Sequence, residues 1–248
     1  MPRGNHANSQ TTKAILGLRE LLLSGVFKPR ERVPELRLVD VLGVSRTPLR
    51  IALMTLAHEG FLETLPGGGF VVREFTRTDI DDAIELRGVL EGTAARLAAE
   101  RLESQDELEP LRELCRELDV VVRSPSMETF MEYLRLNEEF HVAFGELAKS
   151  QQLERALEHV LALPFAGPSA LVMMHAALPE SWEIFLVAQH QHHALVDAIG
   201  RREGARADAI AREHARIARK NLDVALENRA LRERVPGSSL LRLSAAAS

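Results

Sequence analysis

Apolar side chains recur every three to four positions along most of this chain, which predicts amphipathic helices. The period changes only after residue 60. There, residues 61–65 and 70–73 are typical of two short strands, and Pro66 followed by three glycines predicts the turn between them. The pattern therefore predicts a mainly α protein with one β-hairpin in its first third.

A short linker at residues 75–78 divides the predicted helices into two groups. Before it the pattern predicts three helices and the hairpin. After it nearly the whole chain predicts helix, in segments near residues 79–102, 104–123, 127–149, 152–163, 168–176, 180–200 and 204–228. We therefore expect a first domain at residues 1–76, an antiparallel all-helical bundle at 77–230 and a flexible tail at 231–248.

The run VSRTPLR at residues 44–50 is typical of a helix that begins just after a sharp turn. Gly43 suits the end of the preceding helix, because glycine accepts a left-handed backbone. Ser45 and Thr47 can cap the new helix, and Pro48 suits its first turn. With the hairpin behind it, this arrangement predicts a winged helix-turn-helix.

Two arginines in that run, Arg46 and Arg50, are four positions apart and share a face near the helix N-terminus. In a helix-turn-helix this end enters the major groove, where arginine bonds guanine or phosphate. Ser45 and Thr47 can contact phosphate there. The wing glycines let backbone N–H groups approach a phosphate: Gly67, Gly68 and Gly69. We predict that double-stranded DNA binds here; the alternative is a three-helix domain with two solvated arginines.

Charge is unevenly divided between the two predicted domains. The whole chain has a net charge of −5. Residues 1–77 hold 11 Lys+Arg against 7 Asp+Glu, and residues 78–248 hold 20 against 29. A basic first domain on an acidic body is consistent with DNA binding.

Cys115 is the only cysteine, which excludes an internal disulfide and fits a reducing compartment. No apolar run is long enough to span a bilayer, and the first residues lack the apolar core of a signal peptide. These features favour a cytoplasmic protein without a membrane partner.

Three predicted helices of the bundle each carry a histidine within an apolar stripe: His141, with Asn137 one turn before it, His192 and His214. Three neutral imidazoles that converge inside a bundle suit zinc, nickel or another divalent ion. Unpaired imidazoles buried there would be costly. The alternative for each is a core histidine that a neighbouring side chain satisfies.

The first domain resembles the DNA-binding domain of GntR-family bacterial transcription regulators. The resemblance rests on four runs: GVFKPRERV at 25–33, VSRTPLR at 44–50, EGFL at 59–62 and GFV at 69–71. It implies that Arg46 and Arg50 contact the operator. Ile51 stands where the family usually has glutamate, and Leu36 where some relatives have an arginine that contacts DNA.

The bundle resembles the FCD effector domain that accompanies this winged domain. The resemblance rests on ELRGVLE at 85–91, NEEFH at 137–141, QH at 191–192 and EH at 213–214. It implies a metal held by Asn137, His141, His192 and His214, with Asn137 in place of the commoner aspartate. The run DAIELRGVLEG at 82–92, together with Asn137, is most similar to the vanillate-responsive repressor branch.

The resemblance implies a homodimeric repressor that binds a palindromic operator and is released by a small carboxylate, aromatic or otherwise. Arg87 is our candidate for a bidentate clamp on that carboxylate; its alternative is a salt bridge within the bundle. Aromatic residues and methionines can line the effector pocket or simply form core: Phe140, Phe144, Phe165, Met173, Met174 and Phe185. We expect no enzymatic activity. The alternatives are a metalloenzyme with Glu138 or Glu139 as base and a DNA-binding protein whose metal is purely structural.

Overall fold

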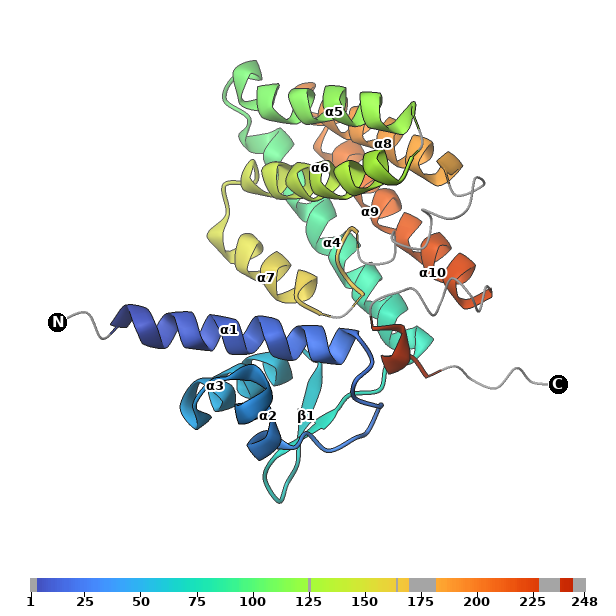
Figure 1. Ribbon diagram of the computed structural model, residues 1–248. Helices are drawn as coiled ribbons and strands as arrows, with labels where there is room; N and C mark the ends of the chain where they lie inside the picture. The colour runs from blue at the N-terminus through green and yellow to red at the C-terminus, as the bar shows by residue number, and fades with distance from the viewer. Residues whose placement is uncertain (1–3, 125, 164, 170–181, 228–236, 243–248) are drawn as a thin grey trace. The chain divides into compact units, whose positions relative to one another are not determined.

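The computed structural model of the chain describes residues 4–124, 126–163, 165–169, 182–227 and 237–242. The chain divides into two compact units (Figure 1). The first consists of Met1–Ile80 together with Val235–Ser248, and the second of Asp81–Arg234. In the described residues, regular β-strands occur only in the first unit.

The first unit is a winged helix-turn-helix. Its elements are α1 (Gly4–Leu23), α2 (Glu35–Leu42), α3 (Arg46–His58), β1 (Leu62–Thr64) and β2 (Phe70–Val72). The strands pair antiparallel, with Leu62 opposite Val72. Leucines of α1 and α3 have no exposed surface and form the centre of its core: Leu18, Leu22, Leu53 and Leu56. The predicted fold of this part is confirmed.

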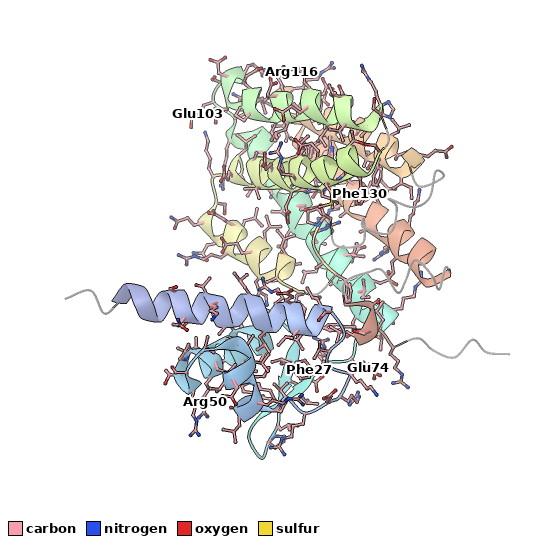
Figure 2. The ribbon with its side chains drawn as sticks, viewed as in Figure 1. Phe27, Arg50, Glu74, Glu103, Arg116 and Phe130 are labelled. Atoms are coloured by element: carbon pink, nitrogen blue, oxygen red, sulfur yellow. The ribbon has the colours of Figure 1, made fainter. Side chains whose placement is uncertain are left out.

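The second unit is helical throughout its described residues and starts within α4. Its elements are α4 (Arg77–Arg101), the 3-10 turn η1 (Gln105–Leu108), α5 (Glu109–Val122), α6 (Met127–Glu146), α7 (Gln151–Leu161), α8 (Trp182–Gly200), α9 (Gly204–Ala215) and α10 (Ile217–Glu227). Helix α5 packs against α6 and α8, and α8 packs against α9. Apolar side chains from these helices, such as the buried Phe130 labelled in Figure 2, form one core.

Two helix boundaries differ from the periodicity-based prediction. The segment at 104–123 opens with η1, where Ser104 and Glu107 form a capping box, and Pro110 then occupies the first turn of α5. The segment at 204–228 is two helices, because the helix breaks at Arg216. No glycine or proline marks that break in the sequence. The predicted segment at 168–176 lies mostly outside the described residues.

A flexible tail was expected at residues 231–248, but its described part, residues 237–242, packs on the first unit. The short turn η4 (Ser238–Leu240) packs on the first unit, where Leu240 is completely buried. Phe75 N donates to Leu240 O at 2.9 Å, and Arg242 N donates to Phe75 O at 2.7 Å. The short run Ser238–Leu241 shows no helical or strand period, so this contact becomes visible only in the folded chain.

None of the helices in the described ranges has the length and apolar character needed to cross a membrane.

We expect the Leu240→Ala substitution to destabilise the first unit, because it truncates a completely buried side chain in η4, which packs on that unit. A buried leucine truncated to alanine costs about 2–5 kcal/mol. Amide hydrogen exchange of α1 and β2, followed by mass spectrometry, measures the loss. Arg242→Ala is the control, since that side chain is 64% exposed and should change little. Equal exchange in Leu240→Ala and wild type would contradict the assignment of this segment to the first unit.

Candidate DNA-binding surface and metal centre

The recognition helix α3 begins at a position that leaves its N-terminal groups available to a ligand. Ser45 is the N-cap residue, with an extended backbone, but its side chain makes no capping hydrogen bond. The sequence predicted the start of the helix at Ser45 correctly, but the capping hydrogen bond expected from its side chain is not made. Unpaired N–H groups at the positive end of a helix attract phosphate, and the exposed hydroxyl of Ser45 stands beside them.

Arg46, Thr47 and Arg50 are all exposed on α3, and Figure 2 shows Arg50 directed away from the body of the unit. The opposite face of the helix is buried through Leu49 and Leu53. This amphipathic division fixes the direction of the two arginines. Neither has an ion-pair partner among the described residues, so both guanidinium groups can bind an external anion.

The wing is the turn between β1 and β2, and two of its glycines are required by the backbone. Gly68 and Gly69 have φ values of 88° and 87°, in the left-handed region that side chains with a Cβ rarely adopt. Gly67 has no such constraint and lies in open space. Arg32 Nη2 donates to Gly68 O at 3.1 Å and so holds the wing. Sequence analysis missed this role of Arg32, because the two residues are far apart in the chain.

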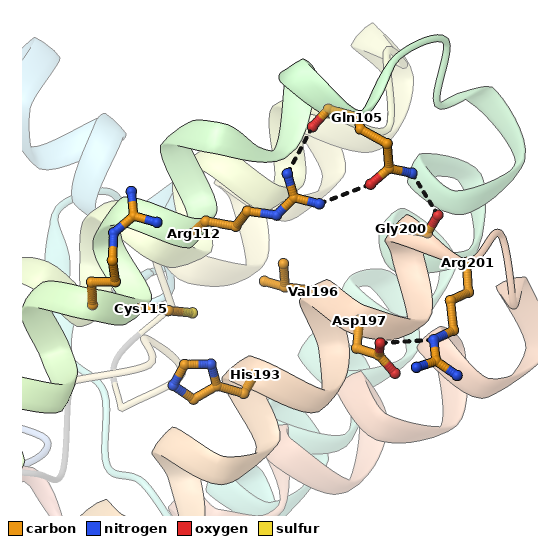
Figure 3. A pocket seen from close by; sticks show the side chains of 9 residues that line it. Gln105, Arg112, Cys115, His193, Val196, Asp197, Gly200 and Arg201 are labelled. Carbon is orange, nitrogen blue, oxygen red and sulfur yellow. Dashed lines mark hydrogen bonds and ion pairs between the residues drawn. The ribbon is translucent and has the colours of Figure 1, made fainter.

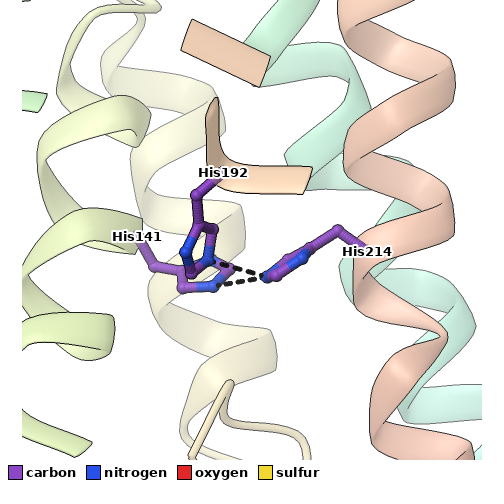
Figure 4. Close-up of side chains that lie close together, drawn as sticks. All are labelled: His141, His192 and His214. Carbon is purple, nitrogen blue, oxygen red and sulfur yellow. Dashed lines mark hydrogen bonds between the residues drawn. The ribbon is translucent and has the colours of Figure 1, made fainter. Parts of the chain in front are cut away.

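In the second unit, three helices bring three histidines together (Figure 4). His141 lies on α6, His192 on α8 and His214 on α9. The Nε2 atoms of His192 and His214 are 3.2 Å apart, as are those of His214 and His141. His192 has no exposed surface, and the other two are 7% and 8% exposed.

Each of these imidazoles has an oxygen atom opposite its other nitrogen, Nδ1. The partner of His141 is Glu91 Oε1 at 3.0 Å, that of His192 is Gln189 Oε1 at 3.0 Å, and that of His214 is Gln191 Oε1 at 3.1 Å. An oxygen acceptor at Nδ1 places the proton there and leaves Nε2 with a bare lone pair. With all three protons on Nδ1, three lone pairs would face one another, and a cation among them would remove that repulsion. The donor set fits a divalent metal ion with outer-shell acceptors on each histidine.

Burial keeps His192 and His214 in the neutral form that a metal requires. It lowers the pKa of His192 well below 6.5 and the pKa of His214 to about 3, with a further contribution from the neighbouring imidazoles. Burial by itself would raise the pKa of Glu91, but the charge of Arg87 and the contacts with His141 outweigh it and lower that pKa to about 2. Glu91 is therefore a buried carboxylate that accepts a hydrogen bond from His141 Nδ1.

Helix α4 lies close to α9 because two of its residues lack side chains. A Cβ on Gly92 would lie 2.3 Å from Asp208 Oδ1, and one on Gly88 would lie 3.2 Å from Ala215 Cβ. This close approach brings Arg87 and Glu91, one helical turn apart on α4, to the histidine cluster.

The helix break at Arg216 supplies a partner for Arg87. Arg219 N donates to Arg216 O, and the carbonyl of Ala215 accepts a bond of 3.0 Å from Arg87 Nη2. Arg87 is 2% exposed and its Nε lies 3.8 Å from Glu91 Oε2, too far for a hydrogen bond. Nε and Nη1 of Arg87 have no hydrogen-bond partner in the described structure.

A small cavity brings four of the predicted site residues together. Arg87, Asn137, His141 and His214 line it, and its volume is about 20 Å³. This space accommodates one ion or water molecule, which needs at least about 10–15 Å³. Asn137 is buried, and its Nδ2 donates to Ser169 Oγ at 3.3 Å.

The other predicted pocket residues belong mainly to the core. Phe140 and Phe144 are buried in the main cluster, and Phe185 joins them while also lining the small cavity. Phe165 is buried as well, and Met173 and Met174 lie outside the described residues. The two proposed catalytic bases are exposed: Glu138 and Glu139. Glu139 pairs with Arg135, so neither glutamate lies at the buried histidines.

A larger hollow of about 430 Å³ lies among η1, α5 and α8 (Figure 3). Its polar lining is already paired: Arg112 with Gln105, and Arg201 with Asp197. Cys115 also lines it, and burial, assisted by Asp119, raises the pKa of this thiol to about 12, which leaves it unreactive. The small cavity, lined by His141, His214 and Arg87 with its unpartnered nitrogens, is therefore the candidate ligand site.

Family comparison agrees with both halves of this structure. Residues 10–72 match the gntR family of bacterial regulatory proteins, and residues 82–216 match the FCD domain. The chain therefore belongs to the GntR family of bacterial transcription regulators and carries an FCD effector domain.

Curated relatives have the same class of function. The chain is 32% identical to the HTH-type regulator YdhC of Bacillus subtilis over 58% of this chain and 62% of that relative. It is 38% identical to the Nta operon transcriptional regulator of Aminobacter aminovorans over 54% of this chain and 61% of that protein. These two matches thus span about three fifths of the relatives. A 28% identical match to the Glc operon transcriptional activator of Escherichia coli covers 88% of this chain and 92% of the activator.

Solved structures share the fold. Escherichia coli McbR/YncC is 27% identical with a TM-score of 0.54, and the match covers 87% of this chain and 96% of that one. Lar, which controls the expression of the Listeria monocytogenes agr system, has a TM-score of 0.59 at 20% identity, over 85% of this chain and 96% of that one.

We expect the metal-free protein to lose stability as the pH falls. His192 and His214 titrate near 6.5 when unfolded, and their pKa is lower when folded. From about pH 6.5 down to about pH 3 the unfolded chain therefore binds protons that the folded protein does not. The free energy of unfolding should decrease by about 1.4 kcal/mol per pH unit for each such histidine. Glu91, whose pKa is also lowered on folding, adds a loss in the same direction at lower pH.

Urea unfolding at a series of pH values, followed by circular dichroism in the presence of a chelator, measures this dependence. The double variant His192→Asn/His214→Asn should show a shallower fall. The exposed His190 provides the control, so His190→Asn should keep the wild-type slope. An unchanged slope in the double variant would show that the two buried histidines are not the source.

Proposed function

We propose that this regulator is a homodimeric repressor that binds a palindromic operator in the cytoplasm and is released by a small carboxylate. The carboxylate binds in the FCD domain beside a divalent metal ion, zinc or nickel. The observation that carries this proposal is the pair of unpartnered nitrogens on buried Arg87, in the same cavity as the converging histidines.

The unpartnered nitrogens of Arg87 favour an anionic ligand. A buried donor without a partner costs about 1–3 kcal/mol, and more when it is charged. A carboxylate oxygen can accept a charge-assisted hydrogen bond from either of these nitrogens. Glu91 does not serve this purpose, because its Oε1 is bonded to His141 and its Oε2 lies 3.8 Å from Arg87 Nε. An external carboxylate would therefore satisfy a need that the chain leaves open.

His141, His192 and His214, together with Asn137, are the residues that would hold the ion. When bound, the ion would supply a positive centre that attracts the effector anion. The chain's own residues fix that centre, because Glu91, Gln189 and Gln191 hold the Nδ1 protons and direct the Nε2 lone pairs inward.

The size of the cavity connects effector binding to a change of shape. A volume of about 20 Å³ holds an ion or one water molecule, and an aromatic acid is many times larger. The effector would therefore bind an opened form of the bundle more tightly than the form described here. A ligand shifts an equilibrium only through such a difference in affinity. We propose that this shift changes the spacing of the two DNA-binding units in the dimer.

The operator would be read by α3 and the wing of each protomer. Arg46 and Arg50 would contact base edges or phosphates, Ser45 and Thr47 would contact phosphates, and Gly67, Gly68 and Gly69 would allow close approach of the wing. Exposed Leu36 and Ile51 replace polar family residues, so base recognition would differ at those positions. One relative is named an activator, and repression is therefore the part of this proposal that a reporter assay must decide.

A second candidate, a purely structural metal, is favoured by the small size of the cavity. In that case the ion would join α6, α8 and α9, and no acid would affect DNA binding. Ligand-dependent release of DNA separates the two candidates.

We expect the double variant Arg46→Ala/Arg50→Ala to lose sequence-specific DNA binding by at least about 30-fold, since each arginine contact to a base or phosphate is worth about 1–3 kcal/mol. Fluorescence anisotropy at fixed salt, with DNA from upstream of the protein's own gene, measures the affinity. Arg155→Ala, an exposed arginine on α7, is the matched control. Equal affinity of the double variant and wild type would exclude α3 as the recognition helix.

We expect an acid from a panel of vanillate and related carboxylates to release wild-type protein from this DNA. Arg87→Met should bind DNA within about threefold of wild type but require at least about tenfold more acid, because it loses a charge-assisted hydrogen bond to the acid. Arg112→Met is the control, since this partly exposed arginine lines the larger hollow and not the small cavity. Circular dichroism checks folding of each variant. Release at the wild-type acid concentration in Arg87→Met would contradict the clamp.

A further inference from the structure

Three side chains supply an oxygen acceptor to the histidine cluster, and two of them end in an amide whose oxygen and nitrogen can exchange places by rotation. Glu91 accepts at either oxygen because its carboxylate has no proton. Gln189 and Gln191 carry amides, and an amide turned by 180° would present N–H₂ rather than oxygen to the imidazole. The tautomers of His192 and His214 therefore depend on what fixes each amide.

The amide of Gln189 is fixed by two acceptors from α5. Its Nε2 donates to the carbonyl oxygen of Cys115 at 2.8 Å and to Asp119 Oδ1 at 2.8 Å. Turning the amide would place Oε1 against these two oxygens and break both hydrogen bonds. Gln189 is 4% exposed, so water does not replace them. Its Oε1 must therefore point at His192 Nδ1, 3.0 Å away.

Asp119 is itself held as a carboxylate. Burial would raise its pKa, but hydrogen bonds from His193 and Gln189 outweigh burial and lower it. His193 Nε2 lies 2.9 Å from Asp119 Oδ1 and donates to it, since an ionised carboxylate only accepts. His193 and Cys115 both line the hollow in Figure 3, so this chain of contacts extends from the surface to the buried cluster.

The situation of Gln191 is different. This residue is partly exposed, and its single hydrogen bond among the described residues is the one to His214. Water can satisfy either orientation of its amide. Of the two glutamines, only Gln189 is anchored at both ends.

We propose that Gln189 is a positioning residue, which Asp119 and the Cys115 carbonyl hold in the orientation that keeps the proton of His192 on Nδ1 and its Nε2 lone pair directed into the cluster. This inference deepens the proposed metal centre and rests on it for its purpose. The tautomer itself is a property of the metal-free protein and is tested without any metal.

The first measurement is a long-range proton–nitrogen correlation spectrum of the metal-free, full-length protein with ¹⁵N-labelled histidine. Wild-type His192 should be in the Nδ1–H form. In Gln189→Met, which keeps the side-chain length but removes the acceptor, His192 should shift largely to the Nε2–H form. Gln152→Met, an exposed glutamine on α7, is the matched control and should leave His192 unchanged.

The wild-type spectrum keeps the test decisive if Gln189→Met folds poorly, because the proposed orientation of Gln189 requires the Nδ1–H form of His192. A charge-swapped double variant, Asp119→Asn/Gln189→Glu, adds a rescue. The carboxylate introduced at position 189 can accept from His192 Nδ1 and from the amide introduced at position 119, although one of its oxygens also faces the Cys115 carbonyl oxygen. Return of the Nδ1–H form in this variant would support the proposal, whereas a role limited to packing predicts no such rescue. His192 in the Nε2–H form in the wild type, or in the Nδ1–H form in Gln189→Met, overturns the proposal.

The second measurement is the affinity for Ni²⁺, by competition with a chromophoric chelator. Loss of an outer-shell partner should weaken binding about 10- to 100-fold in Gln189→Met and leave Gln152→Met unchanged. Equal Ni²⁺ affinity in Gln189→Met and wild type would overturn the proposed importance of Gln189 for the metal. If the tautomer of His192 shifts in Gln189→Met but the wild type binds no Ni²⁺, the metal centre is rejected and the role of Gln189 in positioning the proton is kept.

Discussion

Three imidazole nitrogens face one another in the centre of the helical domain, and each imidazole has an oxygen atom opposite its other nitrogen. Glu91, Gln189 and Gln191 come from two helices and each bonds one Nδ1. The resulting Nε2 lone pairs would repel one another at 3.2 Å without a cation. Helices α4, α6, α8 and α9 together place these nitrogens and the oxygens behind them. A metal ion among the Nε2 atoms would remove the repulsion between their lone pairs without any change in protonation.

Arg87 owes its position to two features of its surroundings. Gly88 and Gly92 allow α4 to approach α9, and the break at Arg216 leaves the Ala215 carbonyl to accept from the guanidinium. A fully helical segment at 204–228 would engage that carbonyl within the helix. The cavity would then have no fixed arginine beside the histidines. The helix break is therefore part of the construction of the ligand site.

The DNA-binding unit has a similar division between local and distant determinants. Its recognition helix is defined by residues close together in the chain, with Arg46 and Arg50 opposite a buried leucine face. Its wing, however, is held by a hydrogen bond from Arg32, and Leu240, near the other end of the chain, is buried in it. The chain leaves this unit at residue 80 and returns to it at residue 235, so two segments connect it to the effector domain.

Features that depend on neighbours along the chain could be predicted from the residues alone: the helical periodicity, the strand pair, the start of α3 at Arg46 and the placement of His141, His192 and His214 on apolar stripes. These follow from 3.6 residues per helical turn and from the backbone preferences of glycine and proline. Which atoms meet across helices became known only from the folded chain. The acceptors behind each histidine, the bond from Arg87 to Ala215, the small volume of the cavity and the burial of Leu240 join residues remote in sequence. Their geometry is set by how the helices pack, and no spacing along one helix encodes it.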